Sequence, residues 1–327
     1  MATPKKPSID VTIAIPTYDG EEHLEKLLSS VFDQSTVLNY NVLIIDSGSS
    51  DQTLEIISKF SKVKLHKIPN SEFGHGKTRN LAVSMSNATY VVFLSQDAIP
   101  ATPKWLDSII EPFKINDNIF CVFGKQSPRK FTDATTKREV YSVFKSLGPD
   151  HSIMLHRGKS LIDSQDLVQK LTFFSDVNSA VKTKFLLEKI PYRDVRYSED
   201  QLLGKDILDS GYLKAYAPSA EVIHSNDYPI KKYFARRIDE YSAMYEYLGV
   251  TPEGRIISLV KLFVMETLRD YVFIIRDTDY LFRQKLKNFF ESPIRIFEKL
   301  RASYFVNKNK EKLYLMDKHS LEKIIKK

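Results

Sequence analysis

The chain has 327 residues, 43% of them hydrophobic and 27% charged, with a formal net charge of +7. This length and composition support the core of one large or two ordinary domains and exclude a disordered protein. Its single cysteine, Cys121, excludes an internal disulfide and fits a reducing cytosol.

The first hundred residues alternate apolar strands with amphipathic helices. Residues 1–10 contain two prolines and no apolar run, so we expect a disordered lead-in rather than a signal peptide. The expected strands cover residues 11–16, 41–46, 63–68 and 90–94, and helices fill the intervals between them. Single helices between strands require right-handed crossovers, which predicts a parallel sheet with helices on both faces.

After about residue 125 the pattern becomes mixed and then helical. We expect a helix over 200–208 and short strands over 212–217 and 221–224. From Pro229 the sequence predicts helices almost throughout, with breaks near 251–252, 277 and 292–293. We therefore divide the chain into the lead-in, an α/β domain over 11–226 and a basic, largely helical region over 227–327.

Polar side chains follow the expected strands at one edge of the predicted sheet. They lie in the stretches PTYDG (16–20), DSGSSD (46–51), SEFGHGKTRN (71–80) and SQDA (95–98). Because the carboxyl ends of parallel strands meet at one sheet edge, these stretches are expected to form a site. The sequence has no glycine-rich phosphate loop, so a bound phosphate would need another partner such as a metal ion. Asp97 is then either a metal ligand or a turn former before Pro100.

In order and spacing, these stretches resemble family 2 glycosyltransferases with the GT-A fold, over roughly residues 10–226. The segment SEDQLLGKDILDSG (198–211) completes the match. Within that family the chain looks most like rhamnosyltransferases of bacterial surface polysaccharides, on the segments FGHGKTRN (73–80), VFGKQSPR (122–129), FFSDVNSAVK (173–182) and HSNDY (224–228). The resemblance implies an α/β fold of the Rossmann-like GT-A type, with a mostly parallel sheet, followed here by the helical region.

The resemblance also implies a role for each matching residue. Asp200 matches the catalytic base, and Asp97 and His224 match ligands of an Mg²⁺ or Mn²⁺ ion, a cation that suits carboxylate oxygens. The expected contacts to the donor nucleotide are Pro16, Thr17, Tyr18, Asp46, Arg79 and Gln96. The expected contacts to the donor or acceptor sugar are His75, Lys125, Gln126, Asn178 and Glu199. The expected contacts to the diphosphate are Arg236 and Arg237.

Several of these residues also have plain structural interpretations. Asp46 can be part of a simple turn, and His224 can be a structural hydrogen-bonding residue. Arg236 and Arg237 fit a solvated helix face. A carboxylate at position 200 can cap a helix, although Ser198 is also available as the cap. The family pattern D-x-D has an Asp where this chain has Ser95, which leaves one strong ligand there.

The function that the resemblance implies is inverting transfer of a sugar from a nucleotide diphosphate to a glycan or a lipid-linked glycan. The expected donor is dTDP-L-rhamnose, and the alternative is a UDP-sugar such as UDP-GlcNAc or UDP-Gal, because thymine and uracil differ by one methyl group. A sugar-binding relative without activity and a basic nucleic-acid-binding protein remain as further alternatives. No nucleic-acid-binding motif is present in the sequence, so nucleic acid is not an expected partner.

The positive charge is concentrated near the end of the chain. From Leu281 onward there are 13 Lys and Arg residues against 5 Asp and Glu. Among them lie the apolar stripes Phe282, Leu286, Phe289, Phe290, Ile296, Phe297 and Leu300. Such helices either lie on an anionic membrane, form a homodimer interface or pack on the core. We therefore expect a cytoplasmic protein that can sit on the inner face of the plasma membrane.

Overall fold

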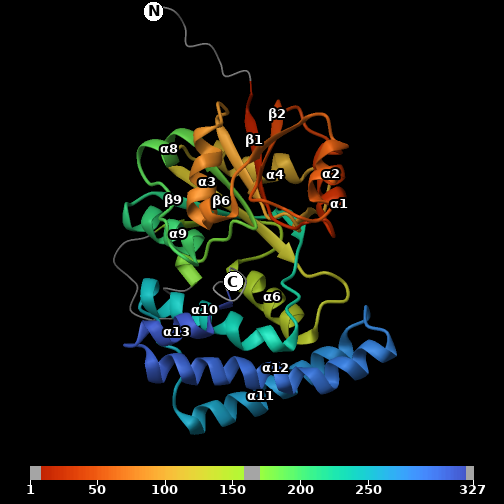
Figure 1. The fold of residues 1–327 in the computed structure, drawn as a ribbon, viewed down its shortest axis with the longest axis vertical. Helices are drawn as coiled ribbons and strands as arrows, with labels where there is room; N and C mark the ends of the chain where they lie inside the picture. Colours follow the sequence, from red (N-terminus) through yellow and green to blue (C-terminus); the bar gives the residue numbers. More distant parts are fainter. Residues whose placement is uncertain (1–8, 158–169, 322–327) are drawn as a thin grey trace, which may run out of the picture. The chain divides into compact units, whose positions relative to one another are not determined.

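The computed structural model describes residues 9–157 and 170–321 (Figure 1). By its internal contacts the chain divides into two units, which we describe separately. Unit 1 comprises the described residues within 1–127, 144–163 and 170–224, and unit 2 those within 128–143 and 225–327. Most of the expected lead-in lies outside the described residues.

The first half of unit 1 contains the predicted parallel strands. Strands β1 (Val11–Thr17), β2 (Tyr40–Asp46), β3 (Val63–Lys67) and β4 (Tyr90–Leu94) pair in the order β3-β2-β1-β4, all parallel. Helices α1 (Leu24–Phe32), α2 (Thr53–Ser58) and α3 (His75–Ser84) connect them, with the short 3₁₀ turn Asn70–Glu72 before α3. This register brings Thr17 of β1 opposite Asp46 of β2 at the carboxyl edge.

The second half of unit 1 makes the sheet mixed. The added strands are β5 (Ile99–Pro100), β6 (Ile119–Ser127), β7 (Met154–Arg157), β8 (Asn178–Lys182) and β9 (Leu213–Ile223). Strand β8 runs antiparallel between β4 and β6, and β6 pairs with β9 in parallel. The described part of this half also contains helices α4 (Trp105–Ile110), α5 (Pro112–Ile115), α8 (Thr183–Glu188) and α9 (Glu199–Asp209).

Two strands were expected over 212–217 and 221–224, and the structure has one continuous strand, β9, in their place. The register between β6 and β9 moves from Gly124–Ala217 to Gln126–Val222, so residues 218–221 bulge opposite Lys125. Such a bulge accommodates Pro218, which has no N–H to donate to the ladder. The prediction of two separate strands was therefore wrong, because residues 218–221 form a bulge and β9 continues past it.

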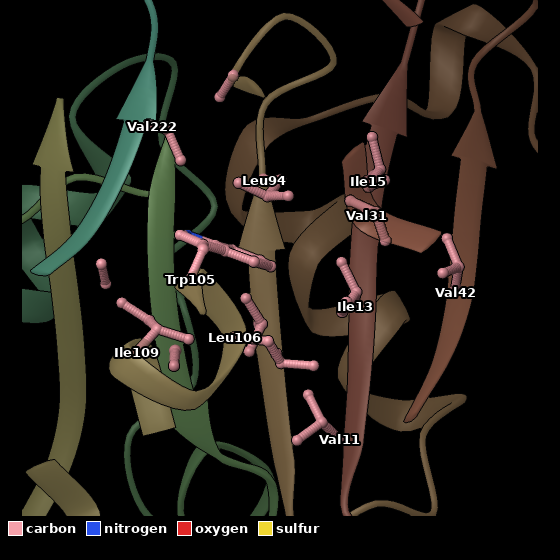
Figure 2. Close-up of a cluster of buried hydrophobic side chains, with 14 of the residues drawn as sticks. Val11, Ile13, Ile15, Val31, Val42, Leu94, Trp105, Leu106, Ile109 and Val222 are labelled. Carbon is pink, nitrogen blue, oxygen red and sulfur yellow. The ribbon is translucent and has the colours of Figure 1, made fainter. Parts of the chain in front are cut away.

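Helices cover both faces of the sheet (Figure 1). Figure 2 shows one face, where Val11, Ile13 and Ile15 of β1 and Leu94 of β4 pack against α1 and α4. The other face is covered by α3, α8 and α9. Cys121 of β6 is fully buried, and burial raises the pKa of its thiol far above the usual value.

Unit 2 is helical. It contains the first turns of α6 (Ala134–Leu147), then α10 (Ile230–Leu248), α11 (Ile256–Arg276), α12 (Phe282–Asn309) and α13 (Leu313–His319). The predicted breaks near 251–252 and 277 are confirmed. The predicted break near 292–293 was wrong, because α12 continues through Pro293. Proline inside a helix costs about 3 kcal/mol, but Ser292 is buried and donates to Asp270 of α11, and Ile296 is buried one turn later.

Candidate active site

The ends of β1 and β4 are joined by the side chain of Gln96. Its Oε1 accepts from the backbone N–H of Tyr18 at 2.8 Å, and its Nε2 donates to the Tyr18 carbonyl at 3.0 Å. The Tyr18 side chain is exposed. Gln96 therefore shapes the loop after β1 and leaves the Tyr18 ring available for a ligand.

Asp46, at the carboxyl end of β2, is buried within its own turn. Its Oδ2 accepts from Thr17 Oγ1 at 3.0 Å and from the Ser49 hydroxyl, and its Oδ1 accepts from the backbone N–H groups of Gly48 and Ser49, each at 3.1 Å. A carboxylate has about four acceptor positions, and here all four are used. In this structure Asp46 holds the turn, and a contact to a nucleotide base would require a partner such as the Ser49 hydroxyl to turn away.

Asp97 and His224 lie together on the same edge of the sheet. His224 Nε2 is 3.5 Å from Asp97 Oδ2, and His224 Nδ1 is 3.0 Å from Gln126 Oε1. Gln126 is oriented by Ser175, because its Nε2 donates to Ser175 Oγ at 3.0 Å. An amide oxygen only accepts, so Nδ1 carries a hydrogen, and in the neutral form of the ring the Nε2 lone pair would lie on the side of Asp97.

An ion cluster centred on Arg79 of α3 lies beside the start of α9. The guanidinium is 3.1 Å from the Asp176 carboxylate and 2.6 Å from that of Glu199, and all three residues are buried. Burial alone would lower the pKa of Arg79, but these two carboxylates outweigh it and the net pKa is raised, so the guanidinium stays charged. Asp176 also accepts from Ser179 Oγ at 2.6 Å and from the Tyr192 hydroxyl at 2.8 Å.

Asp200 is half-buried in the first turn of α9, next to this cluster. Its Oδ2 accepts from the Asp176 backbone N–H at 3.3 Å, and its Oδ1 accepts from the Gln201 backbone N–H at 2.7 Å. Burial raises the pKa of Asp200 well above its usual value, and the charges of Glu199 and Asp176 raise it further. Ser198 occupies the N-cap position in the left-handed region, at φ 62°, and its side chain makes no capping bond.

One short segment connects the Asp97–His224 pair to Asp200. Ser175 holds Gln126 and through it His224, and the next residue, Asp176, donates its N–H to Asp200. The Ser95 N–H, just before Asp97, donates to the Val177 carbonyl at 3.1 Å. The candidate metal pair and the candidate base are therefore positioned by the same segment, 175–177.

The other predicted site residues of unit 1 are placed as follows. Pro16 pairs with Ile45 within the sheet, and His75 is the first residue of α3. Lys125 forms an ion pair with Asp150 at 2.9 Å.

Asn178, an expected contact of the donor or acceptor sugar, is fully buried in this structure. Its amide donates to the Ala220 carbonyl at 2.7 Å and accepts from Trp105 Nε1 at 3.0 Å. It therefore supports the sheet.

Arg236 and Arg237 belong to α10 of unit 2. Arg236 forms an ion pair with Glu240 at 3.2 Å, and Arg237 pairs with Glu139 and Glu240. Unit 2 also has a cavity of about 300 Å³, and none of the predicted site residues lines it. The predicted contact of these arginines with a diphosphate stays a prediction.

Three residues of the site were not among the expected contacts. Asp176 lies in the segment FFSDVNSAVK that carried part of the resemblance. Ser175 lies in the same segment, and its role depends on a partner 49 positions away, Gln126. Tyr192 carries no local signal, because it reaches Asp176 only through the tertiary fold.

Comparison with known proteins identifies relatives of this chain. The sequence profile described as "Glycosyl transferase family 2" matches residues 12–186. The O-antigen chain rhamnosyltransferases RfbN of Salmonella typhimurium and WbaN of Salmonella anatum are each 29% identical, over 70% of this chain and 70% of their own length. The mannosyltransferase PcManGT from Pyrobaculum calidifontis, solved with GDP-Man and Mn²⁺, has a similar fold, with a TM-score of 0.57 at 15% identity over 94% of this chain and 90% of its own. Staphylococcus aureus TarS 1–349, solved with UDP-GlcNAc, has a TM-score of 0.52 at 16% identity over 95% and 78%.

Proposed function

This chain belongs to glycosyl transferase family 2 and is a glycosyltransferase of the GT-A fold, and on this basis we propose that it transfers L-rhamnose from dTDP-L-rhamnose to a glycan acceptor with inversion. The rhamnose donor is suggested by the two O-antigen chain rhamnosyltransferases, which match over most of their length. Their names also suggest a surface polysaccharide as the acceptor.

The observation that carries the proposal is the placement of Asp200 beside segment 175–177. A general base works best when its pKa is near the operating pH, and burial together with Glu199 and Asp176 raises the pKa of Asp200 in that direction. The same segment orients Gln126 and through it His224. The same segment thus positions the candidate base and the candidate metal pair, and this arrangement suits transfer between two bound substrates.

The residues present fit a divalent cation. Asp97 offers a carboxylate, and His224 offers the Nε2 lone pair because Gln126 fixes the hydrogen on Nδ1. Within the described residues no group of three or more metal-ligating side chains occurs, so phosphate oxygens and water would complete the shell. A bound Mg²⁺ or Mn²⁺ would supply charge neutralisation for the departing diphosphate.

The chemical step follows from these positions. Asp200 accepts the proton of the acceptor hydroxyl, and the hydroxyl oxygen forms a bond to the anomeric carbon of the donor. The bond from that carbon to the phosphate oxygen breaks, and its electron pair leaves with the nucleoside diphosphate. Attack from the face opposite the leaving group inverts the anomeric centre.

The role of Asp200 is tested by Asp200→Asn, which keeps the size of the side chain and removes its basicity. We expect turnover to fall by about 10²–10⁴ with donor binding retained. Asp209→Asn is the matched control, because Asp209 lies on the same helix in a surface ion pair with Lys205. Near-normal turnover of folded Asp200→Asn would exclude Asp200 as the base. Glu199 and Asp176 would then be the next candidates for that role.

The donor is tested separately with purified chain and Mn²⁺. Binding of dTDP-L-rhamnose, UDP-GlcNAc and UDP-Gal is compared by thermal shift, because a ligand specific to the folded state raises its stability by mass action. The largest shift with dTDP-L-rhamnose supports the proposal. A larger shift with a UDP-sugar would assign the chain to the alternative donor class.

A further inference from the structure

Helix α11 carries a long exposed apolar stripe. Side chains at spacing of three to four residues are exposed along the whole helix: Ile256, Val260, Val264, Leu268, Val272 and Ile275, with Ile257 beside the first. The helix has 21 residues, so the stripe is about 30 Å long. A contiguous apolar surface of this extent marks an interaction site rather than ordinary exposure.

The inner side of α11 carries its acidic residues beside the buried Ile274, which packs with Ala134 and Tyr280. Its two acidic residues, Glu266 and Asp270, face the interior of unit 2, where Arg138 of α6 binds both. Asp270 is 0% exposed and also accepts from Thr135 Oγ1 at 2.6 Å. A surface helix normally buries its apolar side and exposes its charges, so the outward apolar stripe is supported by a polar network on the inner side.

The charges on the exposed side of α11 are all positive. The exposed charged residues of this helix, which the structure describes in full, are Lys261, Arg276 and Arg269, the last in an ion pair with Glu266 at 2.7 Å. Apolar and cationic residues together, without exposed acids, match an anionic lipid surface. A symmetric dimer through this face would instead bring the same positive surface of two copies together.

Helix α12 extends the apolar surface with aromatic residues. Phe289 stacks on Tyr271 of α11 with ring centroids 4.0 Å apart, and Phe290 lies next to Phe289. Both phenylalanines are exposed, as are Phe282 and Leu286. Of the tail stripe expected from the sequence, Ile296 is buried and belongs to the interior of unit 2.

We infer that α11, with the adjoining aromatic residues of α12, binds an anionic membrane surface and lies in its plane. No helix in the described part of the chain is long and apolar enough to cross a membrane. Attachment of this kind inserts the apolar side to the depth of the lipid headgroups while Lys261 and Arg276 stay at the phosphates. The inference does not depend on the proposed donor or base.

The test is co-sedimentation of the full chain with vesicles at low salt. One set contains phosphatidylglycerol in phosphatidylcholine, and the other contains phosphatidylcholine alone. We expect binding to the anionic set that weakens as salt is raised. The double substitution Val264→Asp and Leu268→Asp should lower the partition coefficient at least about tenfold. Lys261→Glu with Arg276→Glu should abolish the preference for the anionic vesicles.

The control is Val37→Asp, which places one such negative charge at a fully exposed valine of unit 1 and should leave vesicle binding unchanged. Thermal unfolding followed by circular dichroism verifies that each variant is folded. Failure of the wild-type chain to bind anionic vesicles would overturn the inference. The inference would also be overturned if light scattering showed that the lipid-free chain is a dimer and that the double substitution Val264→Asp and Leu268→Asp dissociates it. A second copy of the chain would then cover this face.

Discussion

Replacing Arg79 by methionine tests the ion cluster beside the candidate base. The substitution removes the cation that Asp176 and Glu199 share at 3.1 and 2.6 Å, and both carboxylates are buried, with 1% and 5% exposure. Removing one partner of a buried ion pair destabilises a protein by about 3–5 kcal/mol. We therefore expect the free energy of unfolding of Arg79→Met to fall by about 3–5 kcal/mol at about pH 8.

The loss should shrink as the pH is lowered. Burial raises the pKa of Asp176 in the folded chain, and Arg79 opposes this rise, so the pKa climbs further without the arginine. A carboxyl group whose folded pKa exceeds its unfolded value destabilises the folded state at high pH. This penalty disappears as the pH falls through the folded pKa. A tenfold change in the acid dissociation constant of Asp176 corresponds to about 1.4 kcal/mol.

Urea denaturation at about pH 8 and about pH 5.5 measures both effects. The control is Arg193→Met, whose arginine forms an ion pair with Asp206 at 2.6 Å but has a side chain 56% exposed. Exposed pairs contribute about 0.2–1 kcal/mol, so we expect a small loss of stability that does not change with pH. Equal losses in the two variants, or a larger loss for Arg79→Met at the lower pH, would refute the reasoning.

Three further predictions concern unit 1. Gly124→Ala should destabilise the chain by about 1–3 kcal/mol in urea denaturation, because the new Cβ would lie 2.1 Å from the Ala220 carbonyl oxygen; unchanged stability would show that the two strands can separate locally. His224→Ala should raise the Mn²⁺ concentration for half-maximal turnover by about 10-fold or more, and an unchanged requirement would remove His224 from the metal site. Burial lowers the pKa of Lys214 to about 7, so the folded state is increasingly penalised as pH falls from the usual lysine value towards 7. Lys214→Met should therefore be more stable than the wild-type chain at about pH 7 and similar at about pH 10, and a difference that grows with pH would contradict this.

The parallel half of the fold was predictable from sequence because its signal is local. Strands β1, β2 and β4 contain apolar runs, and α1 has a clear apolar stripe, so order and direction follow from right-handed crossovers. Strand β8, Asn178–Lys182, offered no such signal. It joins the sheet antiparallel between two strands that are distant in sequence, and that pairing depends on tertiary packing.

The candidate site was predictable only in part. The resemblance predicted that Asp97, His224 and Asp200 belong to the site. In the structure Asp97 Oδ2 lies 3.5 Å from His224 Nε2. Their metal and base roles remain predictions. The hydrogen bonds that orient them could not be predicted, because Ser175 and Asp176 act through partners far along the chain. A side chain whose partner is distant in the sequence produces no spacing pattern from which the contact could be predicted.

The buried thiol of Cys121 makes the chain a ready background for spectroscopic labels. It is the single cysteine of the sequence, it is inaccessible in β6, and its raised pKa keeps it from forming the reactive thiolate. A cysteine introduced at an exposed position of α11, as in Val264→Cys, would therefore be the one site that a maleimide dye modifies in the folded chain. The emission of an environment-sensitive dye there would shift when the helix enters lipid. The same dye at Val37→Cys would stay in water, and its emission would not shift.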